Sequence, residues 1–246
     1  MKKLDSLIKL ISASDKEIYP FARRMFRDWQ FKQGKLYLYG KPKGKKANAI
    51  LVAHIDTHRF SKPSIFRKGD LIYAYKDALG ADGRAGLYMT LVLAKRFKIP
   101  FLLTDMALSN DIGAIEFALE NKSRLKGIDL AIGFDLQGFQ KFSFCKKGNK
   151  TAKKRLKKVL KRLNFTNSNE KTNIIKELTK LLNLTGINLS NGFYITRAGI
   201  EVLNVKHFID QLNMYKRIIP EIVKYKPEVN FENSISEIYE RKEVIA

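Results

Sequence analysis

The first 30 residues carry apolar side chains at helical spacing, with polar residues between them. The two apolar stripes are Leu4, Leu7, Ile8 and Ile11, and then Ile18, Phe21, Met25 and Trp29. Residues at this spacing lie on one face of a helix. The pattern therefore predicts two amphipathic N-terminal helices within residues 1–30.

Beyond residue 35 the pattern changes to short apolar runs that alternate with helical stretches. Strands are expected over 36–39, 49–55, 64–68, 71–75, 101–104, 128–135, 141–145 and 200–205, with 64–68 and 71–75 paired around a turn. Helices are expected over 87–97, 112–120, 151–163 and 170–183, and a last helix over 208–224 is bent or broken at Pro220. Because strands and helices alternate, we predict an α/β fold: a three-layer αβα sandwich around a mostly parallel, mixed central sheet.

The length of 246 residues and a hydrophobic content of 45% suit one compact domain with a sizeable core. We expect residues 1–246 to form that single domain, ending in a polar tail over 228–246. No apolar run reaches the ~18 residues that cross a bilayer, so neither membrane insertion nor export is expected. The one cysteine, Cys145, cannot form an internal disulfide, which fits a cytoplasmic protein.

Two of the three histidines, His54 and His58, flank Asp56 at the end of the most apolar run, 49–55. In an open α/β sheet, ligands bind beyond the carboxyl ends of the strands. His54 could bind a metal through one ring nitrogen while Asp56 orients the ring. The alternative is a hydrogen-bonded histidine at a strand end, with no metal.

Further aspartates follow other predicted strands. Asp82 lies in a glycine-rich stretch, Asp105 and Asp111 follow the strand over 101–104, and Asp135 ends the strand over 128–135. Any one of these is commonly a turn or cap residue. Their repetition in a chain with 24 acidic against 47 basic residues favours a metal site. Carboxylates and neutral imidazole are the ligands that Zn²⁺ or Mn²⁺ prefers.

In order and approximate spacing, these motifs resemble those of the zinc exopeptidases with a two-metal site, which include leucyl and glutamyl aminopeptidases and related carboxypeptidases. The resemblance covers roughly residues 45–210 and rests on His54-Ile55-Asp56, the run 80–86, the stretch 104–113, Phe134-Asp135 and His207. It implies a phosphorylase/hydrolase-like zinc-exopeptidase fold. It also implies hydrolysis of peptide bonds by a water that the metal activates.

The resemblance also assigns roles to residues of this chain. By it, His54 and Asp135 would bind one metal, Asp82 would bridge two, and His207 would bind the second. Asp56 would support His54. The cofactor would be one or two Zn ions, with Mn or Co possible, or none where the site has lapsed.

The family's Glu-Glu pair should follow the strand over 101–104, but this chain has no glutamate in 104–113. Two alignments put Met106 with Ala107, or Ala107 with Leu108, at that pair, and none of these side chains binds metal or moves a proton. A third alignment keeps Asp111 as a ligand and puts Asn110 at the general base, where an amide cannot act.

Because the Glu-Glu pair is missing, the sequence is compatible with two functions for the same fold. In the first, the chain is a metal-dependent peptidase in which Asp105 or Asp111 acts as the base and peptides are the substrates. In the second, it has lost hydrolysis and acts as a binding or scaffold protein. Two divalent ions bring +4, whereas Asp82 and Asp135 supply only −2, so one metal is better supported than two.

A third function comes from the formal net charge of +23, which the sequence concentrates in residues 146–162. That segment holds ten basic residues and no acid, namely Lys146, Lys147, Lys150, Lys153, Lys154, Arg155, Lys157, Lys158, Lys161 and Arg162. Such a face could bind a nucleic acid or another acidic partner. The alternative is an ordinary solvated helix face, because aromatic residues that stack on bases are not interleaved there.

Overall fold

The computed structural model describes residues 2–44, 47–57, 62–75, 78–107, 109, 111–125, 127–169 and 175–224. The helices are α1 (Lys2–Ser12), α2 (Asp15–Met25), α3 (Ala81–Phe97), α4 (Ile112–Asn121), α5 (Lys150–Arg162), α6 (Lys176–Leu182) and α7 (Val205–Lys224), with a short 3-10 helix at Lys122–Leu125. The strands of the larger sheet are β1 (Trp29–Gln33), β2 (Tyr37–Pro42), β3 (Ala49–His54), β6 (Phe101–Thr104), β7 (Leu130–Leu136), β8 (Lys141–Phe144), β9 (Thr166–Asn167) and β10 (Thr185–Ser190).

The larger sheet has the strand order β1-β2-β6-β3-β7-β10-β8-β9. Its central strands β6, β3, β7 and β10 are parallel, and antiparallel pairs join β2 to β6 and β8 to β10. Every residue of β3 is buried, as its continuous apolar run predicts. The carboxyl ends of the parallel strands therefore lie at one edge of a buried sheet.

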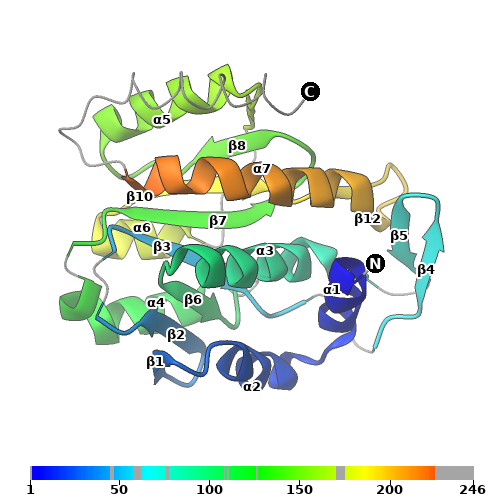
Figure 1. The fold of residues 1–246 in the computed structure, drawn as a ribbon, viewed down its shortest axis with the longest axis horizontal. Coiled ribbons are helices and arrows are strands. Elements are labelled where there is room, and N and C mark those ends of the chain that lie inside the picture. Colours follow the sequence, from blue (N-terminus) through cyan, green and yellow to red (C-terminus); the bar gives the residue numbers. More distant parts are fainter. Residues whose placement is uncertain are drawn as a thin grey trace.

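Helices cover both faces of this sheet (Figure 1). Alternate residues of β3 point to opposite faces, so Leu51 packs in a core with α1, α3 and α7, whereas Val52 packs in a second core with α4 and α6. The predicted three-layer αβα architecture with a mostly parallel, mixed sheet is confirmed.

A second sheet of four strands has the order β11-β12-β5-β4 and includes β4 (Ile65–Lys68), β5 (Leu71–Ala74), β11 (Phe193–Ile195) and β12 (Glu201–Asn204). The predicted pairing of β4 with β5 is present, and Gly69 adopts a positive φ of 59° in the turn between them. This sheet brings the segment after β10 alongside the segment that precedes α3.

Several elements differ from the sequence expectation, among them β1, β10 and α7. Trp29 begins strand β1 instead of ending a helix. The six residues of β10, for which no strand was expected, are all buried in the centre of the larger sheet. Helix α7 runs unbroken through Pro220, because Ile218, Ile219 and Ile222 are buried against the core and outweigh the loss of one backbone donor.

The predicted N-terminal helices are present as α1 and α2, and the predicted polar tail lies outside the described residues. Within the described part of the chain, none of the helices combines the length and low polarity needed to cross a bilayer.

Candidate metal centre

His54 is the last residue of β3, and its side chain is 3% exposed. Its Nδ1 lies 2.9 Å from the backbone oxygen of Asp56 and 3.2 Å from Asp56 Oδ1. Its Nε2 lies 3.4 Å from Asp135 Oδ1. Both ring nitrogens therefore face carboxylate acceptors, Nδ1 toward Asp56 and Nε2 toward Asp135.

Asp82 in the first turn of α3 and Asp135 near the end of β7 complete a group of three with His54. The candidate ligand atoms of the three side chains all lie within 4.8 Å of one another. Of the four ligands that the sequence predicts, the structure brings these three together.

Two glycines let α3 approach the strands closely. A Cβ atom at position 83 would lie 2.6 Å from Cε1 of His54, and one at position 86 would lie 2.1 Å from the backbone oxygen of Phe134. Real Cβ atoms do not come so near, so larger residues would push α3 away from β3 and β7. Gly83 and Gly86 therefore place Asp82 within reach of His54.

Three residues absent from the sequence prediction hold the backbone of the two aspartates. Asn188 on β10 accepts a hydrogen bond from the backbone N–H of Asp135 through Oδ1 at 2.9 Å. Asn191 donates through Nδ2 to the backbone oxygen of Asp82 at 2.8 Å. Glu201 on β12 accepts from the backbone N–H of Asp82 through Oε1 at 2.7 Å. Asn188 and Asn191 are almost completely buried, and the sequence carries no pattern that predicts this.

Several carboxylates lie together in this buried centre, where their negative charges are poorly solvated. Burial opposes a charged ring, but hydrogen bonds to Asp135 and Asp56 outweigh this and raise the pKa of His54 well above its usual value. Burial also raises the pKa of Asp135, although His54 opposes the shift. Burial and the charge of Asp82 raise the pKa of Glu201 to about 7. A cation bound here would neutralise these charges.

The residues present fit a divalent metal ion. One imidazole nitrogen and two carboxylates are ligands that Zn²⁺, Mn²⁺ and Co²⁺ accept, and Asp56 supplies the carboxylate that commonly orients a ligand histidine. With a neutral imidazole, Asp82 and Asp135 contribute −2, which balances one divalent ion.

The two candidate bases follow β6. Asp105 comes directly after the strand, accepts a hydrogen bond from the backbone N–H of Met106 at 2.8 Å, and has a pKa raised by burial. Asp111 precedes α4, is 4% exposed, and its Oδ1 accepts no hydrogen bond from the described residues. Burial raises the pKa of Asp111 to about 7, and the charge of His54 opposes that shift.

The structure places His207 in a different environment, in the first turn of α7. Its Nδ1 lies 2.6 Å from the Tyr194 hydroxyl, and its ring stacks on Phe139 with centroids 4.6 Å apart. Among the described residues, the clustered metal-ligand group does not include His207. His58, the remaining histidine, lies outside the described residues.

The predicted basic helix is present as α5. Ala152, Leu156, Val159 and Leu160 are its buried residues, and the basic side chains other than Lys153 are exposed. Lys153 is partly buried and donates to the backbone oxygen of Cys145 at 2.6 Å.

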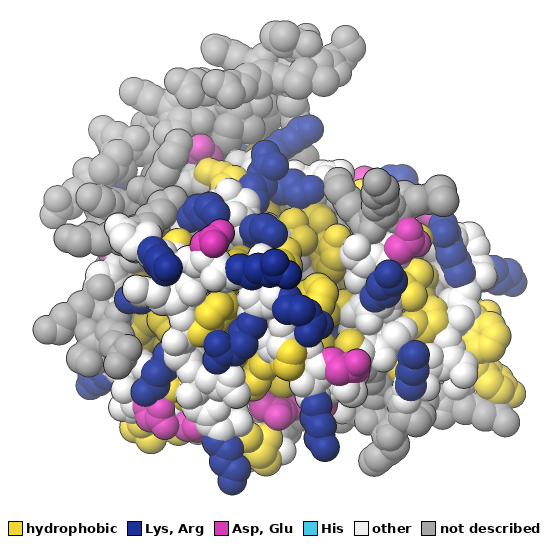
Figure 2. All heavy atoms as spheres, turned by 60° about the horizontal axis from the view of Figure 1, so that its bottom comes forward, with side chains coloured by type: hydrophobic (Ala, Val, Ile, Leu, Met, Phe, Trp, Pro, Cys, Tyr) yellow, Lys and Arg dark blue, Asp and Glu magenta, His cyan; other side chains and the backbone are white. Residues whose placement is uncertain are grey.

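Basic residues are not confined to α5. Figure 2, in which the bottom of Figure 1 comes forward, shows Lys and Arg side chains spread over the described part of this face, with acidic side chains more sparsely placed. Helix α2, at the bottom of Figure 1, carries the exposed Arg23 and Arg24 in its last turn. Basic side chains therefore lie on this face of the molecule as well as on α5.

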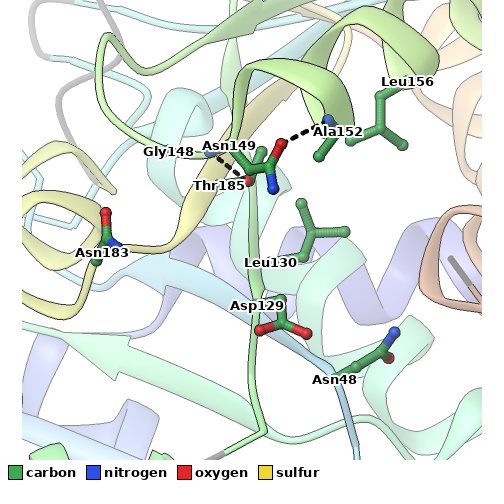
Figure 3. Close-up of a pocket in the computed structure, with 9 residues that line it drawn as sticks. All are labelled: Asn48, Asp129, Leu130, Gly148, Asn149, Ala152, Leu156, Asn183 and Thr185. Carbon is green, nitrogen blue, oxygen red and sulfur yellow. Dashed lines mark hydrogen bonds between the residues drawn. The ribbon is translucent and has the colours of Figure 1, made fainter. Parts of the chain in front are cut away.

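A cavity of about 440 Å³ lies at the opposite edge of the sheet from the metal centre (Figure 3). Its lining residues include Leu130 and Thr185, which begin β7 and β10, whereas Asp135 lies toward the other end of β7. Asn149, at the start of α5, contacts both Ala152 and Thr185 at its rim. This cavity is thus separate from the candidate metal centre.

This chain has the fold of the exopeptidases that its sequence motifs resemble, as solved structures of aminopeptidases and a tripeptidase show. Aminopeptidase PepT from Bacillus cereus ATCC 10987 matches with a TM-score of 0.70 at 12% identity, over 89% of this chain and 98% of that chain. A tripeptidase from Staphylococcus aureus matches with a TM-score of 0.66 at 13% identity, over 91% and 98%. Aminopeptidase APDkam598 from the archaeon Desulfurococcus kamchatkensis matches with a TM-score of 0.66 at 10% identity, over 92% and 96%.

No family model and no curated protein sequence matches the chain. At identities of 10% to 13%, the structural likeness establishes the fold and leaves the chemistry to the residues of the site.

Proposed function

We propose that this chain is a metal-dependent peptidase that holds one divalent ion between His54, Asp82 and Asp135 and removes residues from short peptides. The clustering of these three ligands at one edge of the sheet carries the proposal. The aminopeptidase and tripeptidase activities of proteins with this fold support the choice of substrate. We place the activity in the cytoplasm, because the one cysteine cannot form an internal disulfide.

Each residue of the centre has a part in this proposal. A bound divalent ion would polarise the scissile carbonyl and lower the pKa of water. Asp56 holds the His54 ring, and Asp82 and Asp135 would balance the charge of a bound ion. Asp111 would take the proton from water, because it is buried and its Oδ1 accepts no hydrogen bond from the described residues. Asp105 is the second candidate for that step.

The test is metal-dependent hydrolysis by the purified protein. We expect one Zn, Mn or Co ion per chain, and we expect chelation to stop the release of amino acids from di- and tripeptides until the ion is restored. N-acetylated peptides of the same sequence are the control and should remain intact if the free amino terminus is recognised. A protein without bound ion or turnover would contradict the proposal. One ion without turnover would instead favour the lapsed, binding function.

Helix α5 supports a second candidate function, the binding of nucleic acid or another polyanion. Its apolar residues are buried, so its basic residues form a solvent face along the whole helix. A face of this kind neutralises phosphates and releases counterions, which makes binding sensitive to salt and insensitive to sequence.

We expect the affinity for a single-stranded oligonucleotide to fall steeply between 50 and 300 mM KCl, measured by fluorescence anisotropy. Substituting four lysines of α5 by glutamine should lower the slope of log K against log salt by up to about 3. These lysines are Lys154, Lys157, Lys158 and Lys161. The matched control replaces four exposed lysines on other elements, namely Lys16, Lys35, Lys95 and Lys98. Equal slopes for the two variants would exclude α5 as the binding face.

A further inference from the structure

Glu201 makes an unusual contact for a residue in the second sheet. From the first position of β12, its carboxylate accepts hydrogen bonds from the backbone N–H groups of Gly80 at 2.8 Å and Asp82 at 2.7 Å. These groups begin α3, where backbone donors lack partners within the helix. Gly80 supplies no side-chain cap, so a residue distant in sequence caps this helix.

The backbone of Asp82 is held on its other side as well. Its carbonyl oxygen accepts a hydrogen bond from Nδ2 of Asn191, a residue that is fully buried. The Asp82 carboxylate itself accepts from the backbone N–H of Gly83 at 2.6 Å through Oδ1. The direction of the side chain toward His54 is therefore fixed by contacts of the residue's own backbone, and Glu201 makes one of them.

We propose that Glu201 is a positioning residue of the metal centre: by capping α3 it aims Asp82 at the ion and so sets the affinity for metal. This inference rests on the proposed function, since it assumes that Asp82 binds an ion. Glu201 is not a member of the clustered ligand group, so it acts through Asp82. Partners of this outer kind typically change metal affinity ~10- to 100-fold when they are removed.

The chain offers a matched control in Glu116 on α4. Its carboxylate accepts hydrogen bonds from the backbone N–H groups of Lys35 at 2.7 Å and Leu36 at 3.0 Å. The chemistry is the same as at Glu201, but the segment that it holds precedes β2 and contains no residue of the metal centre. A purely structural effect of losing such a contact should therefore appear equally in both variants.

The experiment compares Zn²⁺ and Mn²⁺ binding to the wild type, Glu201→Gln and Glu116→Gln by titration calorimetry, with thermal unfolding of each metal-free protein. We expect Glu201→Gln to weaken metal binding ~10- to 100-fold and Glu116→Gln to leave it within about 2-fold. The visible spectrum of the Co²⁺-loaded protein should change in Glu201→Gln alone. Wild-type affinity and spectrum in Glu201→Gln would overturn the inference.

Two further outcomes keep the inference and the proposed function apart. If Glu201→Gln does not fold, Glu201→Asp keeps the charge on a shorter side chain, and unchanged metal affinity in that variant would also overturn the inference. A wild type that binds metal without cleaving peptides would contradict the peptidase function and leave the role of Glu201 standing. A wild type that binds no metal would overturn both.

Discussion

Replacing Asp82 by asparagine is expected to abolish metal binding at ion concentrations that saturate the wild type. The substitution removes one of two charged ligands, so the charge facing the ion falls from −2 to −1, and an amide is a much poorer ligand for Zn²⁺ than a carboxylate. The loss should exceed the ~10- to 100-fold effect of removing an outer partner. Peptide hydrolysis should disappear with the ion.

The structure also says why this variant should fold. Glu201 and Asn191 contact the backbone of residue 82, and asparagine keeps that backbone and nearly the same shape. The substitution removes one negative charge from a group in which Asp56 and Asp135 lie around His54. The free energy of unfolding of the metal-free variant should therefore equal or exceed that of the wild type, measured by chemical denaturation.

Asp129→Asn is the matched control, because Asp129 is an exposed aspartate just before the other end of β7. It changes the net charge equally and should bind metal as the wild type does. Undiminished binding by Asp82→Asn would show that Asp82 is not a ligand. A similar loss in both variants would assign the effect to net charge instead of coordination.

The sequence predicts His54 and Asp135 successfully as neighbours because both lie at the ends of strands with strong apolar patterns. The run before His54 is apolar at every position and becomes β3, and Asp135 lies near the end of the apolar run that becomes β7. Because these strands are parallel neighbours, their carboxyl ends meet, and the residues there come together. Asp82 joins them because glycines in α3 permit close packing.

The sequence pattern could not predict the supporting residues Asn188, Asn191 and Glu201, because they follow no apolar periodicity. Strand β10 has the sequence Thr-Gly-Ile-Asn-Leu-Ser, whose apolar residues are too few to predict a buried strand, yet all six residues are buried. Asn188 tolerates burial because its amide bonds to the backbone of Asp135. Glu201 is 119 residues from Asp82, and the pairing of β12 with β5, the strand before α3, helps to bring them together.

The expectation that His207 binds a metal depends on order along the chain and not on a local pattern, and it stays a prediction. A histidine at the start of a helix can face several neighbours, and the tertiary fold decides which. Here it lies against Tyr194 and Phe139, whereas the group of three ligands forms without it. A single ion is consistent with this arrangement of the described residues.

Asp15→Asn is expected to cost much more stability than the loss of an exposed ion pair. Arg84 in α3 is 0% exposed, and its Nη2 donates to Asp15 Oδ1 and to the backbone oxygen of Ala13. The substitution removes a carboxylate that contacts a buried guanidinium group, and breaking a buried pair of this kind typically costs about 3–5 kcal/mol. For a chain of this size, we expect the midpoint of thermal unfolding to fall by roughly 10 °C.

Asp210→Asn is the control for Asp15→Asn. It also removes an ion pair, but the basic partner that it leaves behind is exposed and not buried. Asp15 and Asp210 are equally exposed, at 41% and 42%, but Lys206, the partner of Asp210, is 67% exposed where Arg84 is 0% exposed. Water and salt already solvate the Lys206–Asp210 pair, so its loss should leave the unfolding midpoint unchanged within error. Because the Arg84 contact joins the start of α2 to the first turn of α3, Asp15→Asn should also loosen α3 beside Asp82 and speed hydrogen exchange there. Equal stability of the two variants would show that Asp15 does not hold the charge of Arg84 in the core.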